Sequence, residues 1–529
     1  MTSAVLSAVL PQTVAAADAG SGATVVGRLV QAWSETHPDA VAAGAAAEGP
    51  ISWIRTAAGE DVPIPTEDVA GVQVGSTMSV TVAAKDDDGE DGSEVLDSEV
   101  LAPAETTATA VGARITNEVT VAMVGPGGTQ SDGTSLASVV AAVNGPVATF
   151  WSQQSDGAIS IGVTGQHDWL STPVDCSEPG ALWDDVAERV HFEPGPGKHL
   201  VVYVSRAAGC AYAMGEVGLA PTSGGRLYVQ DTLPSVLAHE FGHNFGLGHS
   251  AGFQCEAAVE TGSCRTAGYR DRYDVMGASW GQLGSLNALQ AADLGVLPAA
   301  AQQDLSVWGR AAAVTLAPLG GRTGTTALRL TDADGVDYWL EYRAATGQDA
   351  WLARNRGSHG LEAGVLLRRA GAFPDTSLLL DPTPSAAASW DADFSSALPV
   401  GTAVPVAGGQ FTVLVDAVDA DGAVVRIVPS PPTAAGAAPA APAGGSRAGA
   451  VLPGAAGAEA SSAPDSGKTP VLWAPHSEPF LAAERSPTLV SAADGSGLAG
   501  IVVPAVAVLL LGGGVLLLQV SRSAAARRR

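Results

Sequence analysis

The stretch from residue 239 to residue 249 constrains the fold of this chain more than any other. It reads HEFGHNFGLGH, and three of the chain's nine histidines fall inside it. Histidines four positions apart lie about one turn apart on a helix and project from the same face, so His239 and His243 are predicted to stand side by side. Gly246 can leave that helix with a positive φ, which a residue with a side chain adopts only at a cost. The turn that follows would bring His249 back toward the other two histidines.

The three imidazoles predict a metal site, with zinc as the expected ion. Three neutral imidazole ligands leave the fourth tetrahedral position open to water, which is typical of a catalytic zinc rather than a structural one. Glu240 directly follows the first ligand, so its carboxylate would reach a water on the metal. It could then act as general base and as proton donor to the departing amine of a peptide bond. An amphipathic core helix with histidines at its rim is the alternative, and the full spacing disfavours it.

A second signal is the segment YDVMG at residues 273–277, whose Met276 lies 27 residues after His249. Together with HEFGHNFGLGHS at 239–250, this segment resembles the metzincin clan of zinc metallopeptidases, and within it the gametolysin-like (reprolysin-like) secreted enzymes. In that clan a methionine turn lies beneath the zinc and packs there without binding it. The specific likeness covers about 40 residues, with weaker support over about 117–300.

The resemblance implies a role for each matching residue. The zinc ligands would be His239, His243 and His249, the general base Glu240, and the methionine of the turn Met276. One position departs from the related astacin- and serralysin-like enzymes, in which a tyrosine two residues after the methionine contacts the zinc. This chain has Ala278 there, so the sequence does not support a tyrosine switch of that kind.

The composition is that of a globular protein. The chain has 529 residues, enough for two or three domains, and 46% of them are apolar, which is enough to bury real cores. Its formal net charge of −27 argues against nucleic acid as a partner, because no excess of basic residues is available to neutralise phosphates. The expected partner is a protein or peptide substrate, and the sequence indicates no oligomeric state.

The two ends of the chain predict an exported, membrane-anchored protein. Residues 1–17 resemble the apolar core and small-residue cleavage site of a signal peptide, without its basic start. Residues 498–520 carry no charge over a length that can span a bilayer, and the tail at 521–529 contains four arginines. Basic residues beyond a span stay on the cytoplasmic side. We therefore expect a single-pass protein of the cell membrane with its catalytic part outside the cell.

The chain has four cysteines, Cys176, Cys210, Cys255 and Cys264. An even number in an exported chain suggests two disulfides. Of the three pairings, we favour Cys176 with Cys210 and Cys255 with Cys264, because the second pair is close in sequence and would fix the segment after the third histidine. Binding of a second zinc by the cysteines is the rival interpretation, which no C-x-x-C pair supports.

Residues 22–105 alternate short apolar runs with turn-forming and acidic stretches, which predicts a small β-rich domain. By position this domain is either a propeptide or a permanent accessory module, and the sequence favours neither. It contains no cysteine, which excludes latency through a cysteine bound to the zinc. Latency would need another ligand, a bulky plug, or cleavage near Arg114.

Residues 117–300 alternate between strand-like and helix-like patterns, which matches a metzincin-like zinc protease domain. The expected strands are 119–124, 159–163, 200–204 and 225–230, and the expected helices are 135–151, 182–190 and one that starts near Leu233 with Pro234 in its first turn. An edge strand before the cleft would let a peptide substrate add to the sheet as an extra strand.

The remaining regions complete the expected fold class. Residues 304–430 contain seven short apolar runs, which predict a β-sandwich, and residues 431–497 are rich in Ala, Pro, Gly and Ser, which predicts a disordered stalk. The whole would be an α+β metzincin-like catalytic domain flanked by an N-terminal β-rich domain and a C-terminal β-sandwich, with the stalk and one C-terminal transmembrane helix. Acidic stretches at 86–91, 332–335 and 419–422 could attract calcium, but a solvated loop and hairpin turns are the simpler interpretations.

The leading interpretation of function is a zinc-dependent endopeptidase of extracellular proteins, with Glu240 as its general base. A non-catalytic surface adhesion or receptor protein on the same fold is one alternative, and it would be expected to lose the glutamate or a ligand, which this chain retains. A zinc amidase acting on cell-wall peptides is the other, and it would keep every one of these residues. The presence of all these residues does not by itself identify a substrate.

Overall fold

The structure, a computed structural model of the chain, is built mainly of strands. It describes residues 22–37, 49–83, 94–104, 114–354, 361–388, 390 and 392–432. The strands in this part of the chain form three sheets, of ten, seven and four strands. The α-helices within it are few and short, the longest being the 12 residues of α4 (Pro179–Val190).

The ten-stranded sheet runs in the order β3-β2-β1-β9-β10-β8-β6-β7, and β4 and β5 extend it from β1. Its strands are β1 (Ala23–Glu35), β2 (Pro50–Thr56), β3 (Asp61–Ile64), β4 (Thr77–Val82), β5 (Val95–Ala102), β6 (Ile115–Gly125), β7 (Ile159–Ser171), β8 (Lys198–Val204), β9 (Ala213–Glu216) and β10 (Gly225–Val229). Strands β7, β6, β8 and β10 are parallel, whereas β9 is antiparallel to both of its neighbours.

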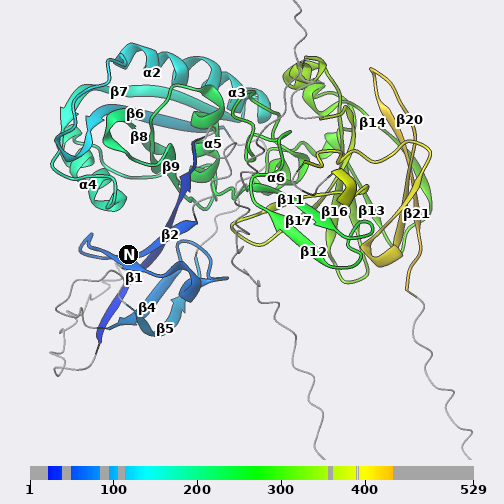
Figure 1. Cartoon of the computed structure of the whole chain (residues 1–529), viewed down its shortest axis with the longest axis horizontal. Helices are drawn as coiled ribbons and strands as arrows, with labels where there is room; N and C mark the ends of the chain where they lie inside the picture. Colours follow the sequence, from blue (N-terminus) through cyan, green and yellow to red (C-terminus); the bar gives the residue numbers. More distant parts are fainter. Residues whose placement is uncertain are drawn as a thin grey trace, which may run out of the picture. The chain divides into compact units, whose positions relative to one another are not determined.

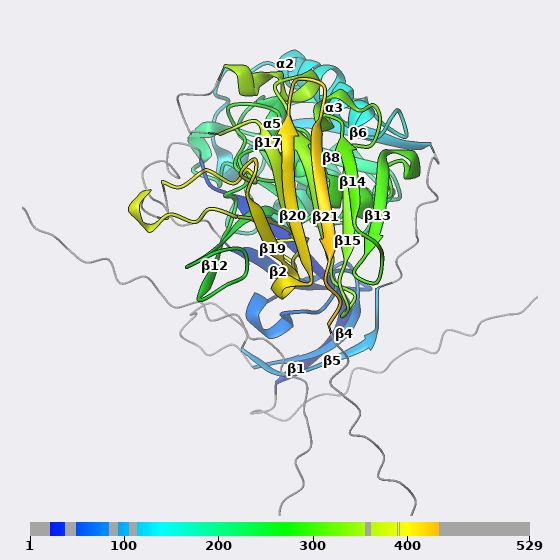
Figure 2. The same ribbon diagram turned by 90° about the vertical axis from the view of Figure 1, so that its right-hand side faces the viewer.

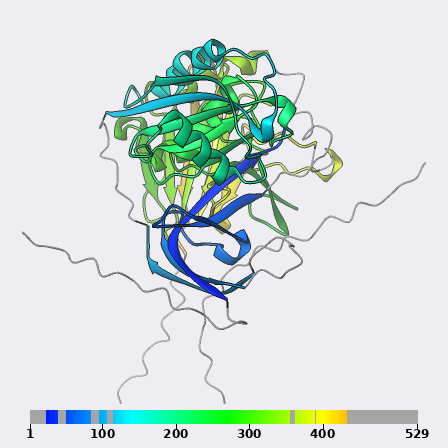
Figure 3. The ribbon, with the colours of Figure 1, turned by 90° about the vertical axis from the view of Figure 1, so that its left-hand side faces the viewer.

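Helices cover both faces of the parallel part of this sheet, as Figures 1 and 3 show. Besides α4, they are α2 (Leu136–Ala142), α3 (Ala148–Gln154) and α5 (Pro234–Asn244), and a further helix, α6 (Ala288–Asp293), lies later in the chain. Val121 of β6 shares a core with α2, α3 and α5, whereas the next residue, Ala122, shares a core with α4. Alternate residues of a strand face opposite sides of a sheet, so the second half of β6, residues 121–125, is buried on both faces and is apolar throughout.

Strand β1 joins two regions of this sheet. Its first part pairs with β4 and its middle with β2, while its last four residues pair with β9. The strand is largely exposed at its start, but every residue from Leu29 to Glu35 is buried. Figure 1 shows β1 as the long dark-blue strand that extends from β4 to β9.

The other two sheets pack on each other around one apolar core, which contains Leu340 and Phe411. The seven-stranded sheet runs β12-β11-β18-β17-β16-β15-β13, and the four-stranded sheet, seen in Figure 2, runs β14-β21-β20-β19. Their strands are β11 (Ser250–Cys255), β12 (Cys264–Ala267), β13 (Gln302–Ser306), β14 (Ala312–Leu316), β15 (Ala327–Thr331), β16 (Asp337–Arg343), β17 (Gly364–Ala370), β18 (Ser377–Leu380), β19 (Ala403–Val406), β20 (Phe411–Val418) and β21 (Ala423–Pro429).

Many of the local elements expected from the sequence are confirmed. The strands expected between 119 and 230 correspond to β6, β7, β8 and β10. The helix expected at 135–151 is a helical run from α2 to α3 that contains a π-helical turn (Val143–Val147) with Pro146 inside it. Proline has no N–H to donate to the preceding turn, so the regular α-helical pattern changes around it.

The fold class expected from the sequence is wrong. The described residues are β-rich with few helices and do not form a clear metzincin fold. Instead of an α+β unit flanked by separate β units, the sheets combine segments from all three regions: β1 pairs with β9, and β11 pairs with β18. Such pairings depend on register and on contacts between distant segments, which local hydrophobic patterns do not encode.

The structure does not describe the segment that was expected to form the transmembrane helix. Over the ranges that the structure describes, no helix is both long and apolar enough to cross a membrane. The segments expected to form the signal peptide (1–17), the span (498–520) and the basic tail (521–529) lie outside those ranges, as does the expected stalk from residue 433 onward.

Candidate metal centre

Helix α5 and the turn after it carry the three histidines of the motif. The helix begins at Pro234, whose fixed φ suits a first helical turn, and ends at Asn244. Gly246 has a φ of +98°, as the sequence predicts, and the chain then turns so that His249 lies beside the helix, its ring centroid 4.9 Å from that of His243. The structure therefore brings all three predicted histidines together.

Backbone carbonyls fix the orientation of the two helical imidazoles. His239 Nδ1 donates to the carbonyl of Val275 at 2.8 Å, and His243 Nδ1 donates to that of Leu247 at 2.9 Å. With the proton on Nδ1, the lone pair of each Nε2 atom points into the site. Partners of this kind are typical of histidines that bind metals.

The donor atoms of these histidines fit a metal ion. The Nε2 atoms of His239 and His243 are buried and have no hydrogen-bond partner among the described residues, which costs free energy unless another group satisfies them. Burial lowers the pKa of His243, and it lowers the pKa of His249 to about 3. A histidine must be neutral to bind a metal, and the lowered pKa values of His243 and His249 keep both rings neutral at pH 7.

A fourth residue, which the sequence did not predict, lies at the centre of the site. Glu35, at the end of β1, places its Oε1 atom 3.2 Å from Nε2 of His239, 3.5 Å from that of His243 and 3.3 Å from that of His249. These four residues form a buried cluster whose ligand atoms all lie within 4.8 Å of one another. Burial would raise the pKa of Glu35, but the close approach of the three imidazoles, His239 foremost, holds this pKa well below its usual value.

Glu240 lies next to this cluster without belonging to it. Its side chain is buried, and neither carboxylate oxygen has a hydrogen-bond partner within the described part of the chain. Burial, and then the nearby charge of Glu35, raises its pKa well above the usual value. The structure thus places a buried carboxyl group, whose neutral form is favoured, beside three candidate ligands.

Met276 packs against α5 at Gly242. A Cβ atom on Gly242 would lie only 2.3 Å from the Met276 sulfur, so the methionine directly contacts the helix backbone between the two histidines. The Met276 N–H donates to Asp274 at 2.7 Å, and the Met276 carbonyl accepts from the Ser250 N–H at 2.8 Å. This position agrees with a packing role beneath the site rather than a ligand role.

Tyr269 is a second residue near the cluster that the sequence did not indicate. Its hydroxyl donates to Glu35 Oε1 at 3.1 Å, and its ring centroid lies 3.9 Å from that of His249. Its carbonyl accepts from the N–H of Ala278 at 2.8 Å. Tyr269 therefore lies beside Ala278, the position at which the related enzymes carry their tyrosine. The two residues are nine positions apart, and only the fold shows that they lie close together.

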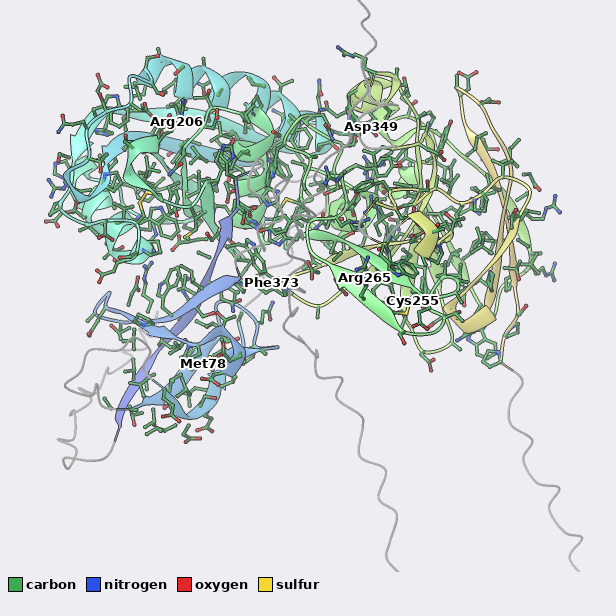
Figure 4. The ribbon with its side chains drawn as sticks, viewed as in Figure 1. Met78, Arg206, Cys255, Arg265, Asp349 and Phe373 are labelled. Carbon is green, nitrogen blue, oxygen red and sulfur yellow. A yellow bond between two sulfur atoms is a disulfide. The ribbon has the colours of Figure 1, made fainter. Side chains whose placement is uncertain are left out.

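A buried ionic cluster supports the segment that carries Met276. Its members, all with no exposed surface, are Arg343, Arg368, Glu341, Asp271, Asp274 and Asp349, the last of which is labelled in Figure 4. Arg368 donates to Glu341 at 2.9 Å and also binds Asp271, which accepts from the Ser250 hydroxyl at 2.8 Å and from the Tyr273 N–H at 3.0 Å. Because Ser250 follows His249, the cluster links β16 and β17 to the third histidine.

Both disulfides that the sequence favoured are present, Cys176–Cys210 and Cys255–Cys264. The second joins β11 to β12, whose paired residues include these two cysteines; Cys255 is labelled in Figure 4. The stretches at 332–335 and 419–422 form hairpin turns in which Asp332 and Asp419 accept backbone N–H groups. The acidic run at 86–91 lies outside the described residues.

His199 of β8 contacts Asn244, the last residue of α5. The environment of His199 predicts that the stability of the fold is sensitive to acid. His199 lies between the side chains of Asn244 and Asn117, each 2.9 Å from a ring nitrogen. Burial lowers its pKa from 6.5 to about 4. Below pH 6.5 the unfolded chain therefore binds a proton that the folded chain does not, so stability falls as the pH drops to about 4, by on the order of 3 kcal/mol.

We expect a His199→Gln variant to lack this part of the acid sensitivity, because a neutral amide can bind both asparagines without titrating. Urea unfolding at pH 7, 6, 5 and 4 would measure the free energy of unfolding of the natural chain and of the His199→Gln variant. Parallel curves for the two chains across this range would contradict the role given to His199.

No protein-family model and no curated protein matches the chain. Among solved structures it is similar to metalloproteinase-II from Bacteroides fragilis, with 13% identity and a TM-score of 0.23 over 34% of this chain and 53% of that one. The chain thus spans about half the length of that metalloproteinase. OgpA from Akkermansia muciniphila is also similar, with 13% identity and a TM-score of 0.22 over 52% of this chain and 84% of that one. Likeness at this level does not establish a family, so the metzincin resemblance rests on the sequence motifs.

Proposed function

We propose that this chain is a zinc-dependent peptidase that hydrolyses peptide bonds of extracellular proteins. The observation that carries the proposal is the convergence of three buried imidazole Nε2 atoms beside Glu240, a buried carboxyl group with a raised pKa. A non-catalytic adhesion protein would have no use for such a group. The two disulfides favour an oxidising, extracellular setting.

The residues present divide the work of hydrolysis between them. His239, His243 and His249 would hold the ion, and a bound zinc supplies Lewis acidity, which lowers the pKa of a water molecule to about 7 and polarises a carbonyl. Glu240 would take a proton from the attacking water as its oxygen bonds to the carbonyl carbon. It would return that proton to the amide nitrogen as the C–N bond breaks.

Metal removal tests this proposal. Because Glu35 lies at the centre of the site, we would use both the natural chain and its Glu35→Gln variant, each with one equivalent of zinc, and an unselected peptide library. We expect cleavage that a chelator abolishes and that added zinc restores. Absence of cleavage in both chains, or cleavage that survives full removal of the metal, would overturn the proposal. Hydrolysis of cell-wall peptides alone would identify an amidase instead.

A further inference from the structure

The outer edge of β9 is already occupied by the chain itself. Residues 32–35 of β1 lie antiparallel to residues 213–216 of β9. Hydrogen bonds continue at both ends of this pairing, from Tyr212 N–H to the Glu35 carbonyl at 3.0 Å and from Val217 N–H to the Gln31 carbonyl at 2.9 Å. An extended peptide can bind a protein by adding a strand to such an edge. The end of β1 therefore lies where a peptide substrate would add to this sheet.

This edge borders the proposed catalytic glutamate. Gly215 of β9 is the register partner of Trp33 in β1. A Cβ atom on Gly215 would lie 2.7 Å from Glu240 Oε2, so the carboxylate contacts the β9 backbone at this position. A peptide paired with β9 would consequently pass close to Glu240.

Glu35 stands at the distance expected of a metal ligand. Tetrahedral zinc ligands at ~2.0–2.1 Å from the ion are separated from each other by about 3.3–3.4 Å. Glu35 Oε1 lies 3.2, 3.5 and 3.3 Å from the three Nε2 atoms. Its side chain is only 1% exposed, and Tyr269 donates to the same oxygen. A carboxylate oxygen completes a donor set that zinc accepts.

Aromatic packing anchors β1 at this place. The Trp33 ring packs edge-on against His249, with centroids 4.2 Å apart, and lies 6.3 Å from Tyr269. Its third aromatic neighbour is Phe373, at 6.1 Å, which is labelled in Figure 4. Trp33 is buried, so removing β1 from β9 would expose this ring and the three histidines together.

We propose that the end of β1 is an inhibitory segment, in which Glu35 is the fourth metal ligand and residues 31–35 fill the peptide-binding edge of β9. The inference rests on the proposed peptidase function and deepens it. It assigns the substrate an extended conformation, antiparallel to β9, and it makes the folded chain latent until β1 leaves that edge.

Cobalt binding in the full chain tests the ligand without relying on activity. We would load the natural chain, Glu35→Gln and the control Glu99→Gln with one equivalent of Co²⁺ and record visible spectra with and without azide. Glu99 is exposed on β5 and makes an isosteric control. We expect azide to shift the spectrum of Glu35→Gln only, because Glu35 fills the position that azide needs in the other two chains. An azide-induced shift in the natural chain would overturn the inference, even if Glu35→Gln did not fold.

Peptide cleavage by the zinc-loaded chains separates this inference from the proposed function. We expect Glu35→Gln to cleave the library at least ~10-fold faster than the natural chain and Glu99→Gln, because freeing the site raises the fraction of competent molecules. Equal, chelator-sensitive cleavage in all three chains would overturn the inhibitory segment and leave the peptidase standing. Azide sensitivity confined to Glu35→Gln, with no cleavage by any chain, would support Glu35 as a ligand and overturn the peptidase.

Discussion

Replacing Glu240 by glutamine should lower the rate of peptide cleavage by about 10²–10⁴-fold, the usual contribution of a general acid–base group, while zinc content stays the same. The amide keeps the shape of the side chain but cannot take a proton from water. Glu240 is not one of the four clustered residues, so its loss should not weaken metal binding. The comparison is best made in the Glu35→Gln chain, where the site is expected to be open.

The matched control is Glu188→Gln, an isosteric change on the exposed face of α4. We expect its kcat and zinc content to equal those of the parent. Steady-state kinetics and metal analysis of the two variants give both readouts. If Glu240→Gln lost its zinc, Glu240 would be part of the metal site; if it kept full activity, another group would have to be the base.

The second large effect is expected for stability, from Arg368→Met. The Arg368 side chain has no exposed surface and neutralises Glu341 and Asp271. Methionine would fill much of the space of the Arg368 side chain. It carries no positive charge, so the buried carboxylates of Glu341 and Asp271 would lose the guanidinium that neutralises them. Removing one partner of a buried ion pair typically costs about 3–5 kcal/mol. We expect the free energy of unfolding to fall by this amount, and the affinity for zinc to fall with it, because Asp271 holds Ser250 beside His249.

Arg329→Met is the control for this change. Arg329 lies on β15 of the same sheet and pairs with Asp304 at 3.0 Å, but about a third of its side chain is exposed. Exposed ion pairs contribute about 0–1 kcal/mol, so this variant should lose little. Urea unfolding in the presence of a chelator would compare the two without the contribution of bound metal. Equal losses in the two variants would show that the buried cluster has no special role.

The local parts of the site were predictable because each rests on short-range rules. The helix at 234–244 follows from the spacing of the histidines and from Pro234, and the positive φ of Gly246 follows from its place after the helix. Met276 could be named because its distance in sequence from the histidines matches a known pattern. These signals lie within about 40 residues of one another.

Glu35 and Tyr269 could not be found in this way. Glu35 ends a strand 204 residues before His239, and nothing in its neighbourhood distinguishes it from other acidic residues. The sequence indicated only that latency without a cysteine would need another ligand, and it did not indicate which residue that would be. The buried ionic cluster was equally hidden, because a charged residue in a strand is usually on the surface and only the packing of β16 and β17 buries these arginines.

The sequence by itself determined the chemistry of this protein: three histidines spaced for one metal, a glutamate beside them, and a methionine to pack beneath. It did so because helix periodicity and a glycine turn fix that geometry over eleven residues. Only the tertiary structure decided what surrounds the site. Strand pairing across long sequence separations placed the end of β1 on β9, because an unpaired sheet edge gains hydrogen-bond partners there. The same pairing placed the Glu35 carboxylate among the three imidazoles.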